Sequence, residues 1–182
     1  MYNKKGFILK FFNKIFSEEP QDKKELLYFI NKSKKNKLIV QNTYNIVKKV
    51  INLENKKVKD IMVPRTQMIT LNIHDTLKKC LKITIQSSYS RFPIMSYDKN
   101  HIIGFLIAKD LFKNIYNDQK NFLLKKIIKK PVIIPDSQNL NRTLKEFYLN
   151  KNYMSIVIDE FGIITGLITI KDILKHLFKK IK

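Results

Sequence analysis

The sequence predicts an α+β fold built from two β-α-β-β-α repeats, related by a pseudo-two-fold axis and preceded by a helical lead-in. The first observation behind this prediction is that Gly104–Leu111 recurs as Gly166–Ile173, with the glycine and the Lys-Asp pair each displaced by 62 residues (166 − 104 and 172 − 110). The second is that similar apolar runs, Pro93–Asp98 and Met154–Asp159, precede these segments across a short turn. An internal repeat defines the folding unit, and two copies suit a pair rather than a solenoid.

Length and composition limit the class of protein. With 182 residues, of which 44% are hydrophobic, the chain is long enough for one compact domain or two small ones. It has no apolar run of about 18 residues and no apolar stretch followed by a small-residue cleavage site at its N-terminus, so we expect neither a transmembrane helix nor a secretory signal. The single cysteine, Cys80, falls in an apolar helical pattern and fits a core position. These features predict a cytoplasmic protein.

The net charge of +21 raises the possibility of a nucleic-acid or anionic-lipid surface. Lysine supplies 33 of the 36 basic residues (36 − 3), because only Arg65, Arg91 and Arg142 are arginines. Proteins that read phosphates and bases favour arginine for its two-pronged guanidinium. We therefore interpret the charge as a compositional bias, and keep an RNA- or ribosome-associated factor as the alternative function.

Residues 1–58 are predicted to form an N-terminal tail and the helical lead-in. The tail segment 6–16 is apolar with interspersed lysines, which fits either a short helix lying peripherally on the inner membrane or a tail that packs on the body or on a partner. Asp22 is a candidate N-cap for a first helix, and a second helix is predicted over residues 38–53. The apolar positions of the two helices are Leu26, Leu27, Ile30, Ile39, Tyr44, Val47, Val50 and Ile51.

The first repeat is predicted over residues 59–120. Pro64 cannot lie inside a helix and favours an extended Val63 before it. A short strand over 68–71 and a helix capped by Asp75 or Thr76 follow, and then come strands over 92–96 and 102–107 and a helix over about 108–116. The residues of the first helix that are predicted to face the core are Leu77, Cys80, Leu81 and Ile85.

The second repeat is predicted over residues 121–182 and has the same order of elements. A linker over about 117–130 contains a short helix near 122–127. A strand over 132–134, a helix over about 140–149, strands over 153–158 and 163–168, and a final helix from 169 or 170 to 181 follow. The turn Asp159-Glu160-Phe161-Gly162 joins the last two strands, and Gly162 is expected to supply the positive φ that the turn needs.

A repeated unit that ends in Gly-hydrophobic-hydrophobic-Thr-x-x-Asp resembles a tandem pair of CBS domains. Four motifs make the resemblance more specific, to the CorC/HlyC family: Asp60-Ile61-Met62-Val63-Pro64-Arg65, Ser90-Arg91-Phe92-Pro93, Ile158-Asp159-Glu160-Phe161-Gly162 and Gly166-Leu167-Ile168-Thr169. The resemblance extends to Lys4-Lys5-Gly6-Phe7 and Glu25-Leu26-Leu27, so it covers essentially the whole chain.

The resemblance implies a regulatory protein associated with magnesium and cobalt efflux, which binds ATP or AMP, with Mg²⁺ as a candidate companion ion, and forms a homodimer. Two departures are visible. The chain stops at Lys182, where the family continues into an acidic stretch and a transporter-associated domain. A flavin that goes with that domain is therefore doubtful. A remnant that has lost its output domain is another alternative function. Thr169-Ile170-Lys171-Asp172 also stands where the family has Thr-x-Glu-Asp.

Six residues form the candidate nucleotide site that the resemblance implies. Asp172 offers a carboxylate to the ribose hydroxyls, and Thr169 offers a hydroxyl at a helix N-terminus that favours anions. Arg91 can fork onto phosphate oxygens. The remaining three, Val63, Tyr89 and Pro93, are expected to surround the base. The alternatives are that Thr169 and Asp172 only cap a helix, that Arg91 forms a surface ion pair, and that Pro93 is an ordinary strand-edge proline.

The equivalent cleft between the repeats is predicted to lack a nucleotide. Ala108 is taken as the counterpart of Thr169, and Asn152-Tyr153 as the counterpart of Arg91-Phe92, so the hydroxyl and the phosphate fork are both missing while Asp110 remains. The sequence contains no Walker A motif, no dinucleotide fingerprint and no nucleophile–base pair. His74, His101 and His176 have no metal-ligand spacing. We therefore expect a binding protein with one site and no enzymatic activity.

Overall fold

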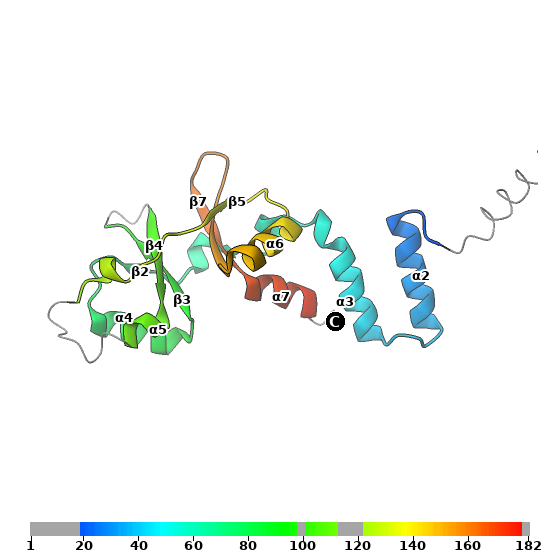
Figure 1. The fold of residues 1–182 in the computed structure, drawn as a ribbon, viewed down its shortest axis with the longest axis horizontal. Coiled ribbons are helices and arrows are strands. Elements are labelled where there is room, and N and C mark those ends of the chain that lie inside the picture. The colour runs from blue at the N-terminus through cyan, green and yellow to red at the C-terminus, as the bar shows by residue number, and fades with distance from the viewer. Residues whose placement is uncertain (1–18, 98–100, 113–121, 180–182) are drawn as a thin grey trace, which may run out of the picture. The chain divides into compact units, whose positions relative to one another are not determined.

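The computed structural model describes residues 19–97, 101–112 and 122–179 (Figure 1). The chain forms two compact units, one comprising Val50–Lys179 and the other holding the first lead-in helix and most of the second. The predicted interfacial segment 6–16 and the predicted helix beyond Phe112 reach residues outside the described ranges. In those ranges, no helix has both the length and the apolar character needed to cross a bilayer.

The lead-in consists of two helices, α2 (Lys23–Lys35) and α3 (Gln41–Asn52). Asp22 caps α2 as predicted, because its carboxylate accepts hydrogen bonds from the backbone N–H groups of Lys24 and Glu25 at 2.7 and 2.8 Å. The second helix begins three residues later than predicted, at Gln41. The ammonium group of Lys34 lies 4.7 Å from the ring centroid of Tyr44, which is a cation–π contact between the two helices. Neither helix contains a buried residue.

The first repeat is a three-stranded sheet in the order β2-β3-β4 with two helices. Its elements are β2 (Leu71–Asn72), α4 (Leu77–Ser87), β3 (Arg91–Met95), β4 (Ile102–Ile107) and α5 (Ala108–Phe112). The core between sheet and helices is built around Leu77, Cys80, Phe92, Leu106 and Leu111.

Two details of this repeat differ from the prediction. The strand expected over 68–71 begins only at Leu71, because Arg65–Gln67 form a 3₁₀ turn that ends at Met68. Ile85, expected to face the core, is 71% exposed, and Thr84 is buried instead. Thr84 lies seven residues, or about two helical turns, after Leu77 and so shares its face, while Ile85 is rotated by a further 100° or so.

The second repeat is a four-stranded sheet in the order β1-β7-β6-β5, also with two helices (Figure 1). The second repeat itself contributes β5 (Ile133–Pro135), α6 (Leu140–Asn150), β6 (Met154–Ile158), β7 (Ile164–Thr169) and α7 (Ile170–Phe178). The remaining strand of the sheet, β1 (Val63–Pro64), comes from the start of the first repeat. Leu53 and Val58, from the short 3₁₀ turns before β1, are buried in the core of this repeat. The β6–β7 turn is held by Asp159, and Gly162 has the expected positive φ, at 79°.

The two repeats exchange edge strands. Strand β1, at the start of the first repeat, pairs antiparallel with β7 of the second, with Val63 opposite Leu167. In the reciprocal position, the linker residue Lys129 exchanges both backbone hydrogen bonds with Phe105 on β4, each 2.8 Å long. A third apolar cluster, formed by Phe105, Met154, Ile156 and Leu167, packs between the two sheets.

The exchange explains why the glycine recurs in both copies. A Cβ atom on Gly166 would lie 2.3 Å from the carbonyl oxygen of Val63, and one on Gly104 would lie 2.7 Å from the carbonyl oxygen of Lys129. Both distances are far below carbon–oxygen contact, so a side chain at either position would push the exchanged backbone away. The repeated glycine is therefore a requirement of the strand exchange.

The strand registers correct the alignment of the two copies. Arg91 lies opposite Ile107 in the first sheet, and Met154 lies opposite Thr169 in the second. The backbone N–H groups of Ala108 and Ile170 then bond to the carbonyls of Ser90 and Tyr153. The counterpart of Arg91 is therefore Met154 rather than Asn152, and the counterpart of Thr169 is Ile107 rather than Ala108. The assignment of Ala108 was wrong because it did not follow the 62-residue displacement of the glycines, which places Ile107 at the position of Thr169. The assignment of Asn152 was wrong in part because the turn between the strands differs in length by one residue.

Candidate functional site

A pocket with a volume of about 240 Å³ lies between the two repeats, and all six predicted site residues line it. The first repeat supplies residues from β1, from the turn before β2 and from the start of β3. The second supplies residues from the start of β6, the end of β7 and the first turns of α7. The predicted residues that the structure brings together here are Val63, Tyr89, Arg91, Pro93, Thr169 and Asp172.

Thr169 and Asp172 form a reciprocal cap at the start of α7. The Asp172 carboxylate accepts hydrogen bonds through Oδ2 from the backbone N–H of Thr169, at 2.9 Å, and from its hydroxyl, at 2.6 Å. The backbone N–H of Asp172 in turn donates to the Thr169 hydroxyl oxygen at 3.3 Å. The two residues therefore cap the helix, and an added role in binding stays a prediction. The other carboxylate oxygen, Oδ1, accepts no hydrogen bond from the residues that the structure describes.

Arg91 begins β3 and is half-buried at the pocket. Its guanidinium carbon lies 5.7 Å from the centroid of the Tyr153 ring, close enough for a cation–π contact across the two repeats. It has no carboxylate partner within the described ranges, so the alternative of a surface ion pair is not what the structure shows there. The guanidinium lies at the pocket beside an aromatic ring, and its hydrogen-bond donors have no partner among the described residues.

The other wall of the pocket is mainly apolar. Val63 enters it because β1 is paired with β7, and Pro93 is buried in the middle of β3. Tyr89 is 56% exposed and its ring contacts Phe92 edge-on, with the ring centroids 6.5 Å apart. The further apolar residues of the wall are Met68, Ile69, Met154, Leu167 and Ile170.

The sequence did not predict three residues of this pocket whose side chains can interact with a polar or charged ligand: Tyr153, Lys171 and Lys175. Lys171 and Lys175 lie four residues apart on α7 and therefore on one face of the helix. That spacing was a usable signal once the helix had been assigned, but it was hidden among the many other lysines. Tyr153 was overlooked because the alignment of the two copies made it the counterpart of the core residue Phe92.

Two other hollows carry charged groups. One, of about 420 Å³, contains Asp75, whose largely buried carboxylate lies 2.6 Å from the ammonium group of Lys79. The other, a shallow hollow of about 630 Å³, adjoins the main pocket and contains Asp60, Asp172 and His176. Among the described residues, no three histidine, cysteine or carboxylate side chains come together as a metal site would require.

The chain was compared with known families, and the sequence model of the CBS domain matches it twice, at residues 58–117 and 124–179. The two matches correspond to the two repeats described above. They cover more than half of the chain.

Curated relatives are similar over nearly the whole chain. The Magnesium and cobalt efflux protein CorC of Buchnera aphidicola subsp. Acyrthosiphon pisum is 46% identical over 180 residues, and the protein of the same name from Escherichia coli K12 is 43% identical over 180 residues. In both cases the match covers 99% of this chain and 62% of the relative. The chain thus spans less than two thirds of the length of these relatives.

Solved structures share the fold. The CBS domain of the bacterial CNNM/CorC family Mg²⁺ transporter is 27% identical, with a TM-score of 0.81 over 90% of this chain and 99% of that one. The same domain in complex with ATP is 31% identical, with a TM-score of 0.70 over 75% and 97%. A CBS-domain pair from Klebsiella pneumoniae with bound AMP is 27% identical, with a TM-score of 0.56 over 66% and 97%.

Proposed function

Because this chain belongs to the CBS-domain family and carries a tandem pair of the CorC type, we propose that it is a regulatory protein that binds one adenine nucleotide between its two repeats. The nucleotide contacts both repeats and favours one arrangement of them. A ligand that binds one arrangement more tightly shifts the population toward it, and a partner that contacts the pair senses that shift.

The observation that carries the proposal is the pocket between the repeats, where an apolar wall faces a set of cations and one carboxylate. In the proposed complex, Oδ1 of Asp172 accepts from the ribose hydroxyls while Oδ2 keeps the cap intact. Arg91 donates to the phosphates, and Val63, Pro93 and Tyr89 surround the base. Two similar solved structures, one in complex with ATP and one with bound AMP, support the choice of an adenine nucleotide.

The equivalent cleft is proposed to be empty of nucleotide. With the corrected registers, Ile107 replaces Thr169 and Met154 replaces Arg91, so the cleft lacks both the hydroxyl and the guanidinium. Only Asp110 keeps its carboxylate. We therefore expect one nucleotide per chain.

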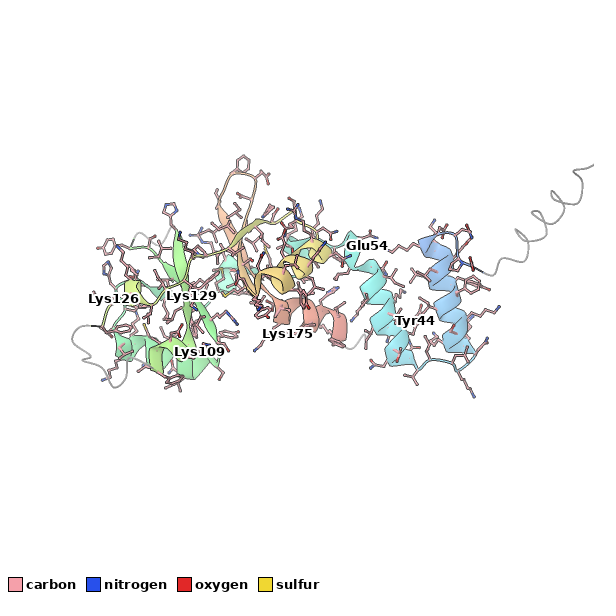
Figure 2. The ribbon with its side chains drawn as sticks, viewed as in Figure 1. Tyr44, Glu54, Lys109, Lys126, Lys129 and Lys175 are labelled. Carbon is pink, nitrogen blue, oxygen red and sulfur yellow. The ribbon has the colours of Figure 1, made fainter. Side chains whose placement is uncertain are left out.

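The names of the curated relatives support a role in magnesium and cobalt efflux, with a transport system as the partner. A homodimer as the working form is part of the proposal and rests on the family resemblance alone. A regulatory role without catalysis is part of this proposal and follows the family resemblance. The described lysines do not favour the RNA alternative, because they occur on the lead-in helices and on both repeats. Figure 2 labels Lys109, Lys126 and Lys129 on the first repeat and its linker, and Lys175 on α7.

The test is calorimetric titration of the full chain with ATP and with AMP, for the wild type and for Asp172→Ala. We expect one site in the wild type and no measurable binding in the variant. Removing the cap also costs about 1 kcal/mol of stability. The matched control is therefore Thr76→Ala, which removes the N-cap of α4, where Thr76 accepts a hydrogen bond from the Lys79 N–H, at a distance from the pocket.

If Asp172→Ala and Thr76→Ala lose similar stability and only the former loses nucleotide, the ribose role of Asp172 is supported. Equal nucleotide affinity in the wild type and in Asp172→Ala would refute the site. Two equivalent sites per chain would refute the proposed asymmetry of the two clefts.

A further inference from the structure

The pocket between the repeats is strongly biased toward cations. Three of its residues, Arg91, Lys171 and Lys175, are basic, and Asp172 is the one acidic residue among the described residues that line it. The three cations come from both repeats, since Arg91 opens β3 and the two lysines lie on the first turns of α7. Figure 2 shows Lys175 extending from α7.

None of these three cations has a carboxylate partner in the described ranges. Elsewhere in the repeats, charged side chains do find partners: Lys79 pairs with Asp75 at 2.6 Å, and Arg142 pairs with Glu146 at 2.8 Å. Unpaired cations gathered around one pocket repel each other and favour an anionic ligand. A phosphate chain supplies several negative charges where one phosphate supplies at most about two.

In the proposed complex, the carboxylates near the pocket are already engaged, because Oδ1 of Asp172 is assigned to the ribose hydroxyls. Oδ2 of Asp172 accepts two hydrogen bonds within the cap. The other carboxylate of the adjoining hollow, that of Asp60, accepts a hydrogen bond from the backbone N–H of Lys57 at 3.0 Å and lies 3.9 Å from the ammonium group of Lys56. Protein-bound Mg²⁺ is held by carboxylates together with phosphate oxygens and water. This pocket offers it little beyond the phosphates themselves.

We propose that Lys171 and Lys175, together with Arg91, make the pocket select the metal-free triphosphate, so that Mg²⁺ weakens nucleotide binding. The inference rests on the proposed function, because it concerns the charge of the nucleotide in the same pocket. Mg²⁺ bound to a triphosphate cancels two of its charges and occupies oxygens that the lysines would otherwise contact. Occupancy of the pocket then falls as free Mg²⁺ rises, which makes the nucleotide a reporter of low Mg²⁺.

The experiment titrates the full chain with ATP and with AMP, once in EDTA and once in Mg²⁺, for the wild type and for the double variant Lys171→Gln/Lys175→Gln. In EDTA, we expect the wild type to bind ATP at least about tenfold more tightly than AMP, a difference of about 1.4 kcal/mol. Mg²⁺ is expected to remove most of that advantage and to leave AMP binding unchanged. The double variant is expected to bind ATP and AMP about equally and to be insensitive to Mg²⁺.

The matched control is Lys145→Gln, which removes an exposed lysine of α6 that lines none of the hollows described above. It must behave as the wild type, since a general effect of net charge would appear in it as well. Tighter ATP binding in Mg²⁺ than in EDTA, or an ATP preference that survives in the double variant, would overturn the inference while leaving adenine-nucleotide binding in place. If the wild type binds neither nucleotide, the proposed function and the inference fail together.

Discussion

Replacing Gly166 with alanine tests the strand exchange that joins the two repeats. The new Cβ atom would lie 2.3 Å from the carbonyl oxygen of Val63 and 3.2 Å from the sulfur of Met62. The first contact joins a Cβ atom, whose position is fixed by its own backbone, to a backbone carbonyl oxygen, so no side-chain rotation relieves it. Strand β1 must move away from β7, and it carries Val63 out of the pocket as it does so.

The expected cost can be built from three contributions. Forcing an extra carbon into a packed site costs about 1 to 3 kcal/mol. Weakening one or two hydrogen bonds of the β1–β7 ladder costs about 1 kcal/mol each. Alanine restricts the unfolded chain relative to glycine, which offsets about 0.4 to 1 kcal/mol. Together these contributions lead us to expect that Gly166→Ala lowers the free energy of unfolding by about 1 to 5 kcal/mol.

The assay is urea unfolding monitored by circular dichroism, with two other glycine variants as comparisons. Gly104→Ala places a Cβ atom 2.7 Å from the carbonyl oxygen of Lys129 and is expected to cost somewhat less than Gly166→Ala. Gly162→Ala meets no atom within 4 Å and bears only the strain of its positive φ, about 1 to 2 kcal/mol, less the same offset. If Gly166→Ala is no more destabilising than Gly162→Ala, the close approach of β1 does not explain the repeated glycine.

Two buried side chains yield further predictions. Burial raises the pKa of the Cys80 thiol to about 12, so the folded protein keeps it neutral where the unfolded chain, with a pKa near 9, ionises. We expect Cys80 not to react with a thiol reagent at about pH 8 until denaturant is added, and rapid labelling of the native protein would contradict this. We also expect the free energy of unfolding to decline as the pH rises from about 9 toward 12. The Ser155 hydroxyl is buried without a hydrogen-bond partner among the described residues. Ser155→Ala is therefore expected to raise the free energy of unfolding by about 1 kcal/mol, which is measured as a higher urea midpoint. A lower midpoint would mean that the hydroxyl has a hydrogen-bond partner.

The fold class could be predicted because the repeat, the caps and the apolar periods agree with one another. The tandem CBS pair in an α+β fold is confirmed, and so are the N-cap at Asp22 and the turn at Gly162. These features depend on neighbouring residues, so the sequence alone contains the information that determines them. The domain boundaries at 58/59 and 120/121 stay predictions.

The errors arise where distant residues decide the outcome. The counterpart of Thr169 could have been found from the sequence, because the 62-residue displacement of the glycines leads to Ile107. The counterpart of Arg91 could not be found in this way, because a turn of different length shifts β3 against β6 by one position relative to the glycines. The short 3₁₀ turn at Arg65–Gln67, which delays β2, forms where the chain crosses from one sheet to the other. All six predicted site residues line one pocket, and their role in binding stays a prediction. The two α7 lysines were not predicted, because no single lysine stands out in a chain with 33 of them.

The strand exchange and the pocket have a common origin. Val63 can line the pocket only because β1 has left its own repeat and lies on β7, and Thr169, at the end of the same β7, continues into the cap that fixes Asp172. A ligand that contacts both Val63 and Asp172 therefore contacts two ends of one continuous sheet and helix unit. Arg91, on β3 of the first repeat, lines the same pocket from the other sheet. In the proposed complex, a nucleotide that contacts both Arg91 and this unit holds the two repeats in one arrangement. Without the nucleotide, Arg91, Lys171 and Lys175, which have no carboxylate partner among the described residues, repel one another and favour a wider arrangement.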